Sequence, residues 1–353
     1  MLVHITKVKG VIDTGNHILD LVITHYKSPW SLGKPQFDML ALQRNINFDD
    51  IGVILVNDGE ESSMPDELFK EYPFEVKNLT IPHAGVSGAR NAGIDASDAQ
   101  WVAILDFDDT YLSANAIHIL LTAAKDDSKV MYWSPFVEEI PKGDGQMIYH
   151  QHGQNYIFNH GKIYRLDWLR KEDIRFCDKL TVHEDVYFNT LAQAVARDDQ
   201  IGQIKSSIHL WCWNPDSVSR KHEDWILKSY NHQIRQRIAL SRQFEDRGLK
   251  DPLELTVVKT FCDGYYDFQQ EGWKKKELSK DYRIAEQWFC SYMKTYWDIY
   301  KRIEPKKIAG MAKIARTYRV EQGMLLMESQ TYRDFLLHMA NDVKPITPDQ
   351  WDL

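Results

Sequence analysis

Between residues 18 and about 214, short apolar runs alternate with amphipathic stretches. This pattern is typical of a sheet whose strands are joined by crossover helices. The runs at 53–56 and 102–105 are apolar without alternation, as expected for central strands that are covered on both faces. The pattern therefore predicts an α/β domain with strands at 18–24, 52–57, 75–81, 101–105, 130–136 and 204–211.

From about residue 222 onward, strand signals fade and segments of helical spacing continue to the C-terminus. Helices are predicted near 222–247, 252–271, 278–302 and 326–342, with breaks at Gly248, Asp251-Pro252, Gly272 and Pro305. We therefore expect two domains, one at 1–220 for catalysis and a helical one at 221–353 for acceptor recognition or homo-oligomer formation. Four aromatic residues share one helical face and favour core packing over a sugar-stacking platform: Trp288, Tyr292, Tyr296 and Tyr300.

Charge and cysteine content limit the compartment and the partners. The 43 Lys and Arg against 51 Asp and Glu give a net charge of −8, which disfavours a surface built for continuous phosphate contacts. The four cysteines form no Cys-x-x-Cys pair, so reduced thiols in the cytoplasm are expected. No apolar run approaches the roughly 18 to 20 residues of a spanning helix, and residues 1–10 lack the apolar stretch of a signal peptide.

An acidic cluster, Asp106-Phe107-Asp108-Asp109, directly follows a predicted strand. Several carboxylates at one strand end repel one another unless a cation neutralises them, and hard oxygen ligands suit Mg²⁺ or Mn²⁺. Such a metal favours a ligand that carries a diphosphate. Asp58 also ends a strand, and ligands of open α/β sheets bind beyond the carboxyl ends of strands, so Asp58 and the cluster are expected to line one crevice.

Two other interpretations of the cluster stay open at this point. It can be an acidic turn that caps a helix beginning near Ser113. The run Asp106 to Thr110 also fits the Asp-x-Asp-x-Thr pattern of haloacid-dehalogenase-type phosphatases, in which Asp106 would be the nucleophile. That pattern usually closes the first strand of its fold, whereas three predicted strands precede it here.

Four motifs in order give the cluster a more specific context. They are Val56-Asn57-Asp58-Gly59, the small-residue stretch from Gly85 to Gly93, Leu105-Asp106-Phe107-Asp108-Asp109, and His183-Glu184-Asp185-Val186-Tyr187-Phe188-Asn189. Together they resemble the motifs of inverting family 2 glycosyltransferases with the GT-A fold, over roughly residues 18–220. The resemblance implies a Rossmann-like mixed sheet and a hexosyltransferase-type enzyme that transfers sugar from a UDP-sugar donor.

The resemblance also assigns donor-binding positions. Asp58 would take the uracil end of the donor beside Thr24 and Tyr26, whose ring could stack on the base. Arg90 and Asn91 would lie near the nucleotide and the sugar, while the glycines around them either admit the ligand or allow tight helix packing. The remaining donor contacts would come from Asp106, Asp109, Ser217, Ser219 and Arg220.

The metal and the base complete the predicted site. The resemblance assigns Asp108 to the metal, and His209 could complete the metal shell, although a lone His near a strand is more often structural. An inverting transfer needs a base on the far side of the anomeric carbon, and Asp185 is the candidate, with Glu184 orienting the site. Helix capping by this acidic pair is the alternative.

The sequence departs from the family pattern at several positions. Asn57 stands where many relatives carry Asp, Glu60 where Ser or Thr is common, and Phe107 where the residue is usually small; residues 28–35 form an insertion near the donor. The acceptor can be a glycan, a wall polymer, a protein or a modified nucleic acid. A non-catalytic module that binds nucleotide sugars is the further alternative, which the intact Asp106, Asp108 and Asp185 disfavour.

Overall fold

The computed structural model describes residues 4–8, 17–217, 227, 229–327, 329–351 and 353. The chain divides into two compact units, Met1–Asn214 and Pro215–Leu353. Among the described residues, no helix combines the length and the apolar character needed to cross a membrane.

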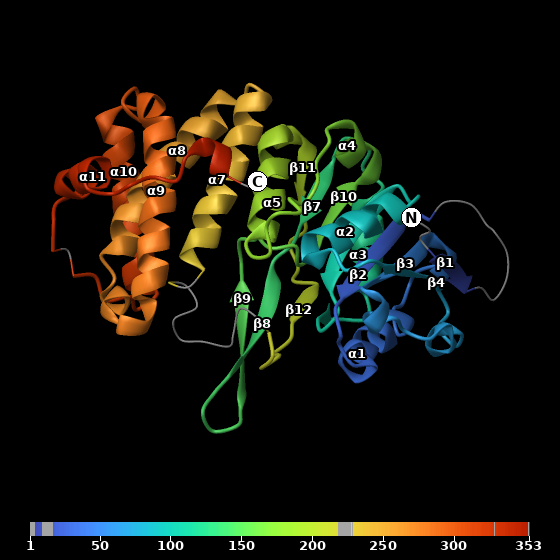
Figure 1. Ribbon diagram of the computed structural model, residues 1–353. Helices are drawn as coiled ribbons and strands as arrows, with labels where there is room; N and C mark the ends of the chain where they lie inside the picture. Colours follow the sequence, from blue (N-terminus) through green and yellow to red (C-terminus); the bar gives the residue numbers. More distant parts are fainter. Residues whose placement is uncertain (1–3, 9–16, 218–226, 228, 328, 352) are drawn as a thin grey trace. The chain divides into compact units, whose positions relative to one another are not determined.

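An eight-stranded mixed sheet forms the centre of the first unit (Figure 1). Its strands lie in the order β1-β4-β3-β2-β5-β10-β7-β11. Four adjacent strands, β4, β3, β2 and β5, are mutually parallel. The bounds are β1 His4–Val8, β2 Leu19–His25, β3 Ile51–Asp58, β4 Glu75–Ile81, β5 Trp101–Asp106, β7 Met131–Trp133, β10 Lys162–Arg165 and β11 Ile201–Gln203.

Helices cover both faces of this sheet because its central strands are apolar on both sides. Leu21, Val53 and Ala103 belong to one core cluster with Phe37 and Ile117, which come from helices α1 (Trp30–Ala41) and α3 (Ala116–Ala123). On the opposite face, α2 (Gly85–Ala96) packs so closely that a Cβ atom at Gly93 would lie 2.2 Å from Val22 Cγ1. Tight helix packing is therefore the role of Gly93. Helices α4 (Leu166–Lys171) and α5 (Glu184–Val195) follow β10.

A second sheet of four strands extends from the first unit, in the order β6-β12-β8-β9. Strands β8 (Phe136–Pro141) and β9 (Met147–His152) pair as a hairpin that projects downward in Figure 1. Strands β6 (Thr110–Tyr111) and β12 (His209–Trp211) connect this hairpin to the acidic cluster. The predicted single strands at 130–136 and 204–211 are therefore wrong. The first contains β7 of one sheet and the first residue of β8 of the other. In the second, only 209–211 forms a strand, β12, because the polar run Lys205-Ser206-Ser207 separates it from β11.

The second unit is helical, as predicted. Its helices are α7 Tyr230–Asp246, α8 Lys250–Phe268, α9 Ser279–Tyr300, α10 Pro305–Glu321 and α11 Tyr332–Asn341. The predicted break at Pro305 is confirmed, because α9 ends at Tyr300, whereas the predicted break at Asp251-Pro252 is wrong, because α8 already begins at Lys250. Pro305 starts α10, and Pro252 lies in the first turn of α8, where the missing N–H of proline costs no helical hydrogen bond. Residues 222–226, part of the first predicted helix, lie outside the described residues.

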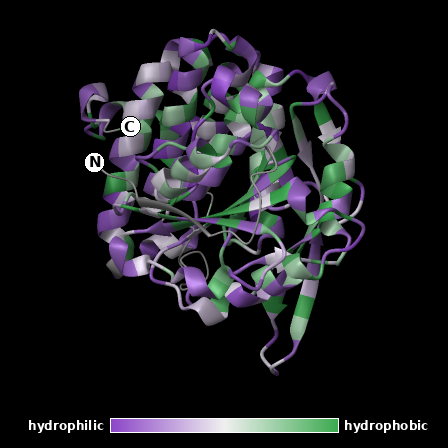
Figure 2. Cartoon of the chain, turned by 90° about the vertical axis from the view of Figure 1, so that its right-hand side faces the viewer, coloured by the Kyte–Doolittle hydropathy of each residue, from purple (hydrophilic) through white to green (hydrophobic). Residues whose placement is uncertain are grey.

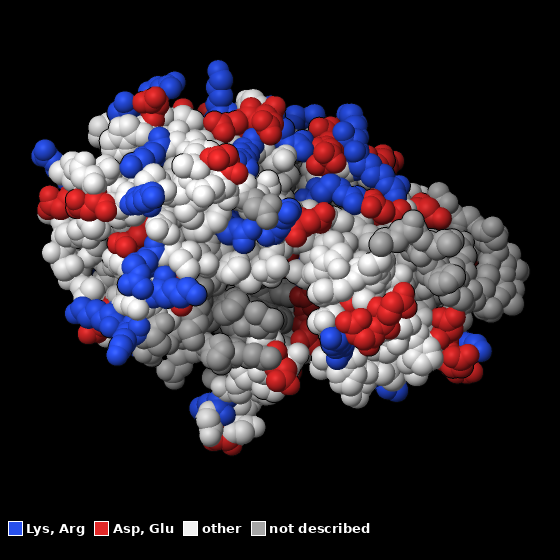
Figure 3. All heavy atoms as spheres, in the orientation of Figure 1, with Lys and Arg blue, Asp and Glu red and all other residues white. Residues whose placement is uncertain are grey.

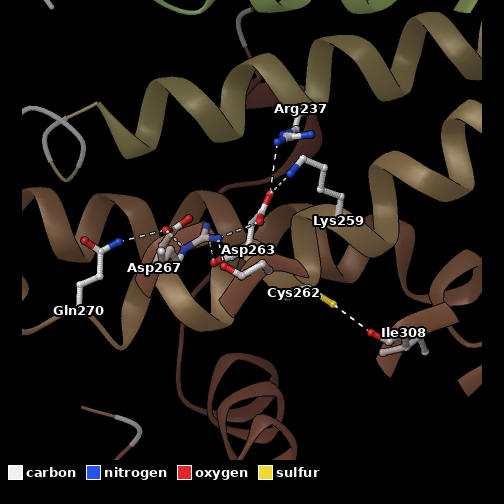
Figure 4. A network of polar contacts seen from close by, with 9 residues as sticks. Arg237, Lys259, Cys262, Asp263, Asp267, Gln270 and Ile308 are labelled. Atoms are coloured by element: carbon white, nitrogen blue, oxygen red, sulfur yellow. Dashed lines mark hydrogen bonds and ion pairs between the residues drawn. The ribbon is translucent and has the colours of Figure 1, made fainter. Parts of the chain in front are cut away.

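Buried rings and buried charges hold the second unit together. Tyr292, Tyr296 and Tyr300 are buried on α9, which confirms core packing for three of the four predicted aromatic residues, while Trp288 is half-buried. Figure 4 shows the charged network, in which Asp263 Oδ2 receives Arg237 Nη2 at 3.3 Å and Lys259 Nζ at 3.0 Å. Arg319, only 4% exposed, joins Asp263 at 3.1 Å to Asp267 at 2.6 Å and thereby links α10 to α8.

Candidate active site

The predicted site residues at the carboxyl ends of β2, β3 and β5 meet at one edge of the sheet. β2 lies between β3 and β5, with Thr24 in register with Asp106 and His25 in register with Asn57. Asp58 and Asp106 therefore end the strands on either side of β2. Thr24 is buried between them, 8% exposed.

Arg90 forms the electrostatic centre of this edge. Its Nη2 donates to Asp106 Oδ1 and its Nη1 to Glu184 Oε1, each at 2.6 Å, while the guanidinium lies over the ring of Phe176. Burial disfavours the charged guanidinium, but the charges of Asp106 and Glu184 outweigh burial and raise the pKa of Arg90. The planar fork of arginine suits this bridge, which joins β5 to the start of α5.

Asp185, the predicted base, lies beside this bridge at the second position of α5. Burial, followed by the charge of Glu184, raises the pKa of Asp185 to about 7, against the lowering effect of Arg90. Its Oδ1 accepts the N–H of Val186 at 2.7 Å. A carboxyl group with a pKa near neutrality suits proton transfer at the pH of most cells.

His183 precedes α5 in the left-handed region, with φ of 62°. A non-glycine residue in this region is uncommon, and such residues concentrate at functional sites. The turn at His183 lets the chain present Glu184 and Asp185 together at the helix start.

Asp58 anchors a second part of the site. Its Oδ1 accepts the N–H of Ala84 at 2.7 Å, and its Oδ2 lies 2.9 Å from His83 Nδ1. The ring of His83 in turn stacks on Tyr26, with centroids 4.3 Å apart. His83 was missed by the sequence analysis, and its position two residues after β4 was the only signal for it. Asp58 keeps further lone pairs for a ligand, and Tyr26 is exposed.

The side chains of Asn91 and Asp109 bond to other parts of the protein. The Asn91 side chain holds the 176–178 segment, with Nδ2 donating to Phe176 O and Asp178 Oδ1 and Oδ1 accepting the Phe176 N–H, all within 3.0 Å. Asp109 is 2% exposed, and its Oδ1 accepts the N–H of Cys212 at 3.0 Å. Protein partners thus engage the polar atoms of both side chains, and the predicted donor contacts of Asn91 and Asp109 stay predictions.

His209 lies against Asp109, with 3.1 Å between Nε2 and Oδ2. His160, also missed by the sequence analysis, lies 3.4 Å from the same oxygen. The ligand atoms of Asp109, His160 and His209 all lie within 4.8 Å of one another, so this buried group could hold a metal ion. Burial lowers the pKa of His209 to about 4 and lowers that of His160 as well, so both rings are neutral at pH 7.

Asp108, the other predicted metal ligand, is half-buried and has different surroundings. Its Oδ2 accepts from Asn214 Nδ2 at 2.7 Å. Carboxylate oxygens such as those of Asp108 are donors that Mg²⁺ and Mn²⁺ prefer. Ser217 is half-buried, while Ser219 and Arg220 lie outside the described residues.

Lys162 is a further group that the sequence analysis missed. It lies on β10 with 1% exposure, and its Nζ donates to the carbonyl of Phe158. Burial lowers its pKa, and the charge of Asp185 acts in the opposite direction. The sequence alone did not predict β10, so nothing indicated that Lys162 would be buried beside Ile163 and Tyr164.

Two of the departures from the family pattern, Phe107 and the insertion at residues 28–35, are in contact with each other. Phe107 packs on Gly33 of α1 so closely that a Cβ atom at Gly33 would lie 2.2 Å from the ring, and it stacks on His25 with centroids 4.7 Å apart. Asn57 is likewise committed to the interior, where it bonds to His25, Asn78 and the N–H of Met64.

Comparison with known proteins gives consistent matches. Residues 37–189 match the profile of Glycosyl transferase family 2. EpsH of Bacillus subtilis (strain 168), whose name assigns it provisionally to the glycosyltransferases, is 24% identical over 207 residues. This alignment covers 53% of the chain and 59% of EpsH, so it spans less than two thirds of that relative.

Solved structures show the same architecture. TarS 1-349 from S. aureus in complex with UDP matches with a TM-score of 0.54 at 14% identity, over 89% of this chain and 98% of that chain. TarS 1-349 in complex with UDP-GlcNAc matches with a TM-score of 0.55 at 14% identity and the same coverage. The likeness confirms the predicted GT-A fold with a helical C-terminal region.

Proposed function

We propose that this chain, whose first unit is a family 2 glycosyltransferase domain, transfers a hexose-type sugar from a UDP-sugar to an acceptor hydroxyl with inversion. The observation that carries this proposal is the bridge of Arg90 to Asp106 and Glu184 beside Asp185, whose pKa is raised to about 7. UDP and UDP-GlcNAc are bound to the similar protein TarS, which supports UDP as the nucleotide.

Each residue has a distinct task in this reaction. Asp58 and Tyr26 bind the nucleoside, and the exposed part of Asp106 binds the ribose and the donor sugar. Arg90 fixes Asp106 and Glu184, so that donor and base keep one orientation. Asp185 takes the proton of the acceptor hydroxyl as the bond to the anomeric carbon forms, and the C–O bond to UDP breaks on the opposite side.

A divalent cation fits the Asp108 carboxylate. Asp108 is partly accessible, whereas the Asp109, His160 and His209 group is too buried to meet a diphosphate. Mn²⁺ or Mg²⁺ bound there would neutralise the charge that develops on the departing UDP. His209 therefore serves this cation only through Asp109, which adjoins Asp108 in the chain.

The topology disfavours the phosphatase alternative. The Asp-x-Asp-x-Thr pattern usually closes the first strand of the phosphatase fold, whereas four strands of the sheet, β1 to β4, precede the strand that ends at Asp106.

UDP release from UDP-glucose, UDP-N-acetylglucosamine and UDP-galactose tests the proposal, with and without Mn²⁺. We expect metal-dependent release with one donor, abolished by Asp108→Ala and by Asp185→Asn. Asp298→Asn is the matched control, because the Asp298 side chain is 77% exposed on α9. Full transfer by Asp185→Asn would disprove the role of the base, and absence of UDP binding in calorimetry would disprove the donor site.

A further inference from the structure

A row of stacked rings runs from the acidic cluster onto the β8–β9 hairpin. His209, which contacts Asp109, stacks on His160 with centroids 4.6 Å apart, and His160 stacks on Trp211 at 5.3 Å. Phe136 stacks on His152 at 4.4 Å, and His152 meets His150 edge-on at 4.7 Å. Phe136 also contacts His160 at 4.8 Å, so the row is continuous.

The outer part of this row is accessible. Phe136, His160 and His209 are buried, but Trp211 and Phe158 are half-buried, His152 is 25% exposed and His150 is exposed. We call the accessible side chains the ring face. It consists of Trp211, Phe158, His152, His150, Ile140 and Ile148.

Strand alternation assigns the distal side chains to two sides of the hairpin. Phe136 pairs with His152, Glu138 with His150 and Ile140 with Ile148, so these pairs lie on one side. Tyr149 and Met147 lie on the other side. Six residues of strand extend about 20 Å, and the hairpin carries hydrophobic colour along its strands down to near the tip in Figure 2.

Exposed apolar side chains on the ring face indicate a binding surface. Ile148 is 50% exposed and Ile140 is 37% exposed, on a segment that is clear of the body of the first unit. A contiguous patch of exposed apolar side chains bordered by polar ones indicates an interaction site, whereas single exposed apolar residues do not.

The charges of the hairpin select the class of partner. Residues 136–152 contain three acidic residues and one basic residue, Lys142, which lies at the tip 3.9 Å from Asp144. In Figure 3, Lys and Arg are interspersed with Asp and Glu over the visible face. A phosphate polymer or an anionic membrane requires clustered cations, so neither fits the ring face.

We propose that the ring face binds the acceptor, and that the acceptor is a chain of uncharged sugar rings. Sugars present apolar C–H faces that stack on aromatic rings, and hydroxyls that donate to carboxylates such as that of Glu138. The row begins at Asp109, which follows the donor-binding Asp106 and the metal-binding Asp108 in the chain, so a saccharide on the ring face has one end at the reaction centre. This inference rests on the proposed function and names its acceptor.

Calorimetry tests the ring face. The full chain, in the presence of UDP, is titrated with cellohexaose, chitohexaose and maltohexaose as uncharged probes and with polyphosphate as the anionic probe. We expect one hexasaccharide to bind, more tightly than its disaccharide because the face is longer than two sugar rings. Ile148→Ser and His150→Ala should each weaken this binding about tenfold. Tyr149→Ser is the matched control, since Tyr149 is 60% exposed one residue away on the opposite side.

The outcomes separate this inference from the proposed function. UDP binding and the slow release of UDP without acceptor should be equal in wild type, Ile148→Ser and Tyr149→Ser. The inference is overturned if no hexasaccharide binds, if polyphosphate binds in its place, or if Tyr149→Ser weakens binding as much as Ile148→Ser. Loss of UDP binding in the wild type would instead overturn the donor site, whatever the saccharides do.

Discussion

Replacing Asp185 by asparagine is expected to stabilise the first unit at pH 8 while it abolishes sugar transfer. Burial, and next the charge of Glu184, raise the pKa of Asp185 from 3.8 to about 7. A shift of about 3 pKa units corresponds to about 4 kcal/mol. The pKa of Asp185 is higher in the folded protein than in the unfolded chain. The protonated carboxyl therefore contributes stability that is fully present below about pH 4, is lost as the pH rises to about 7, and is absent at pH 8.

Asparagine is uncharged at every pH, so the increase in the free energy of unfolding caused by Asp185→Asn grows as Asp185 of the wild type ionises. Linkage gives at most about 4 kcal/mol at pH 8 and about 2 kcal/mol at pH 5. At pH 8 this corresponds to a rise of about 10 °C in the melting temperature of a domain of this size. UDP release should fall at least about a thousandfold, since asparagine accepts no proton.

The assay is thermal unfolding of wild type and Asp185→Asn at pH 5 and pH 8, followed with and without UDP. The transition that UDP shifts identifies the first unit. Asp298→Asn, a change of an exposed carboxylate, should alter stability by less than about 0.5 kcal/mol. Equal stability of wild type and Asp185→Asn at pH 8, or a gain that is the same at both pH values, would refute the reasoning.

Three further predictions concern the other charged groups. Arg90→Lys should lower UDP release at least about tenfold, because a lysine cannot hold Asp106 and Glu184 with a planar fork; a wild-type rate would contradict the bridge. Asp108→Ala should abolish the stimulation by Mn²⁺ that follows treatment of the wild type with a chelator; full stimulation would place the metal elsewhere. Arg319→Met should destabilise the second unit by about 3 to 5 kcal/mol, as buried ion pairs do when one partner is lost, while UDP affinity measured by calorimetry stays unchanged.

Apolar runs without alternation made the central strands predictable. Strands β2, β3 and β5 were predicted to within a residue or two, since parallel strands buried on both faces read as continuous hydrophobic segments. The strand at 75–81, in which apolar and polar residues are mixed, was predicted with its observed bounds. The three-residue strands β7, β11 and β12 are too short to give such a signal. The whole of α10 was missed, because Pro305 was taken only as a break and not also as the start of the next helix.

In the site, too, the sequence motifs predicted which residues act together but not the contacts that depend on tertiary packing. The order of motifs indicated that Arg90, Asp106, Glu184 and Asp185 act together, and the structure brings the first three into contact. No local pattern could show that Asn91 would bond to Phe176 and Asp178, which are more than 80 residues away. The roles of His83 and Lys162 depend on the same long-range packing.

The contact of Phe107 with Gly33 means that the acidic motif and α1 can be exchanged only together. A chimera that takes the motif from a relative with a small residue at position 107 would leave a void the size of a phenyl ring beneath α1, at a cost of about 3 to 5 kcal/mol. A chimera that takes α1 from a relative with any side chain at position 33 would force the Phe107 ring into the donor edge. The natural unit of recombination here is the pair of segments, which lie more than 60 residues apart in the chain.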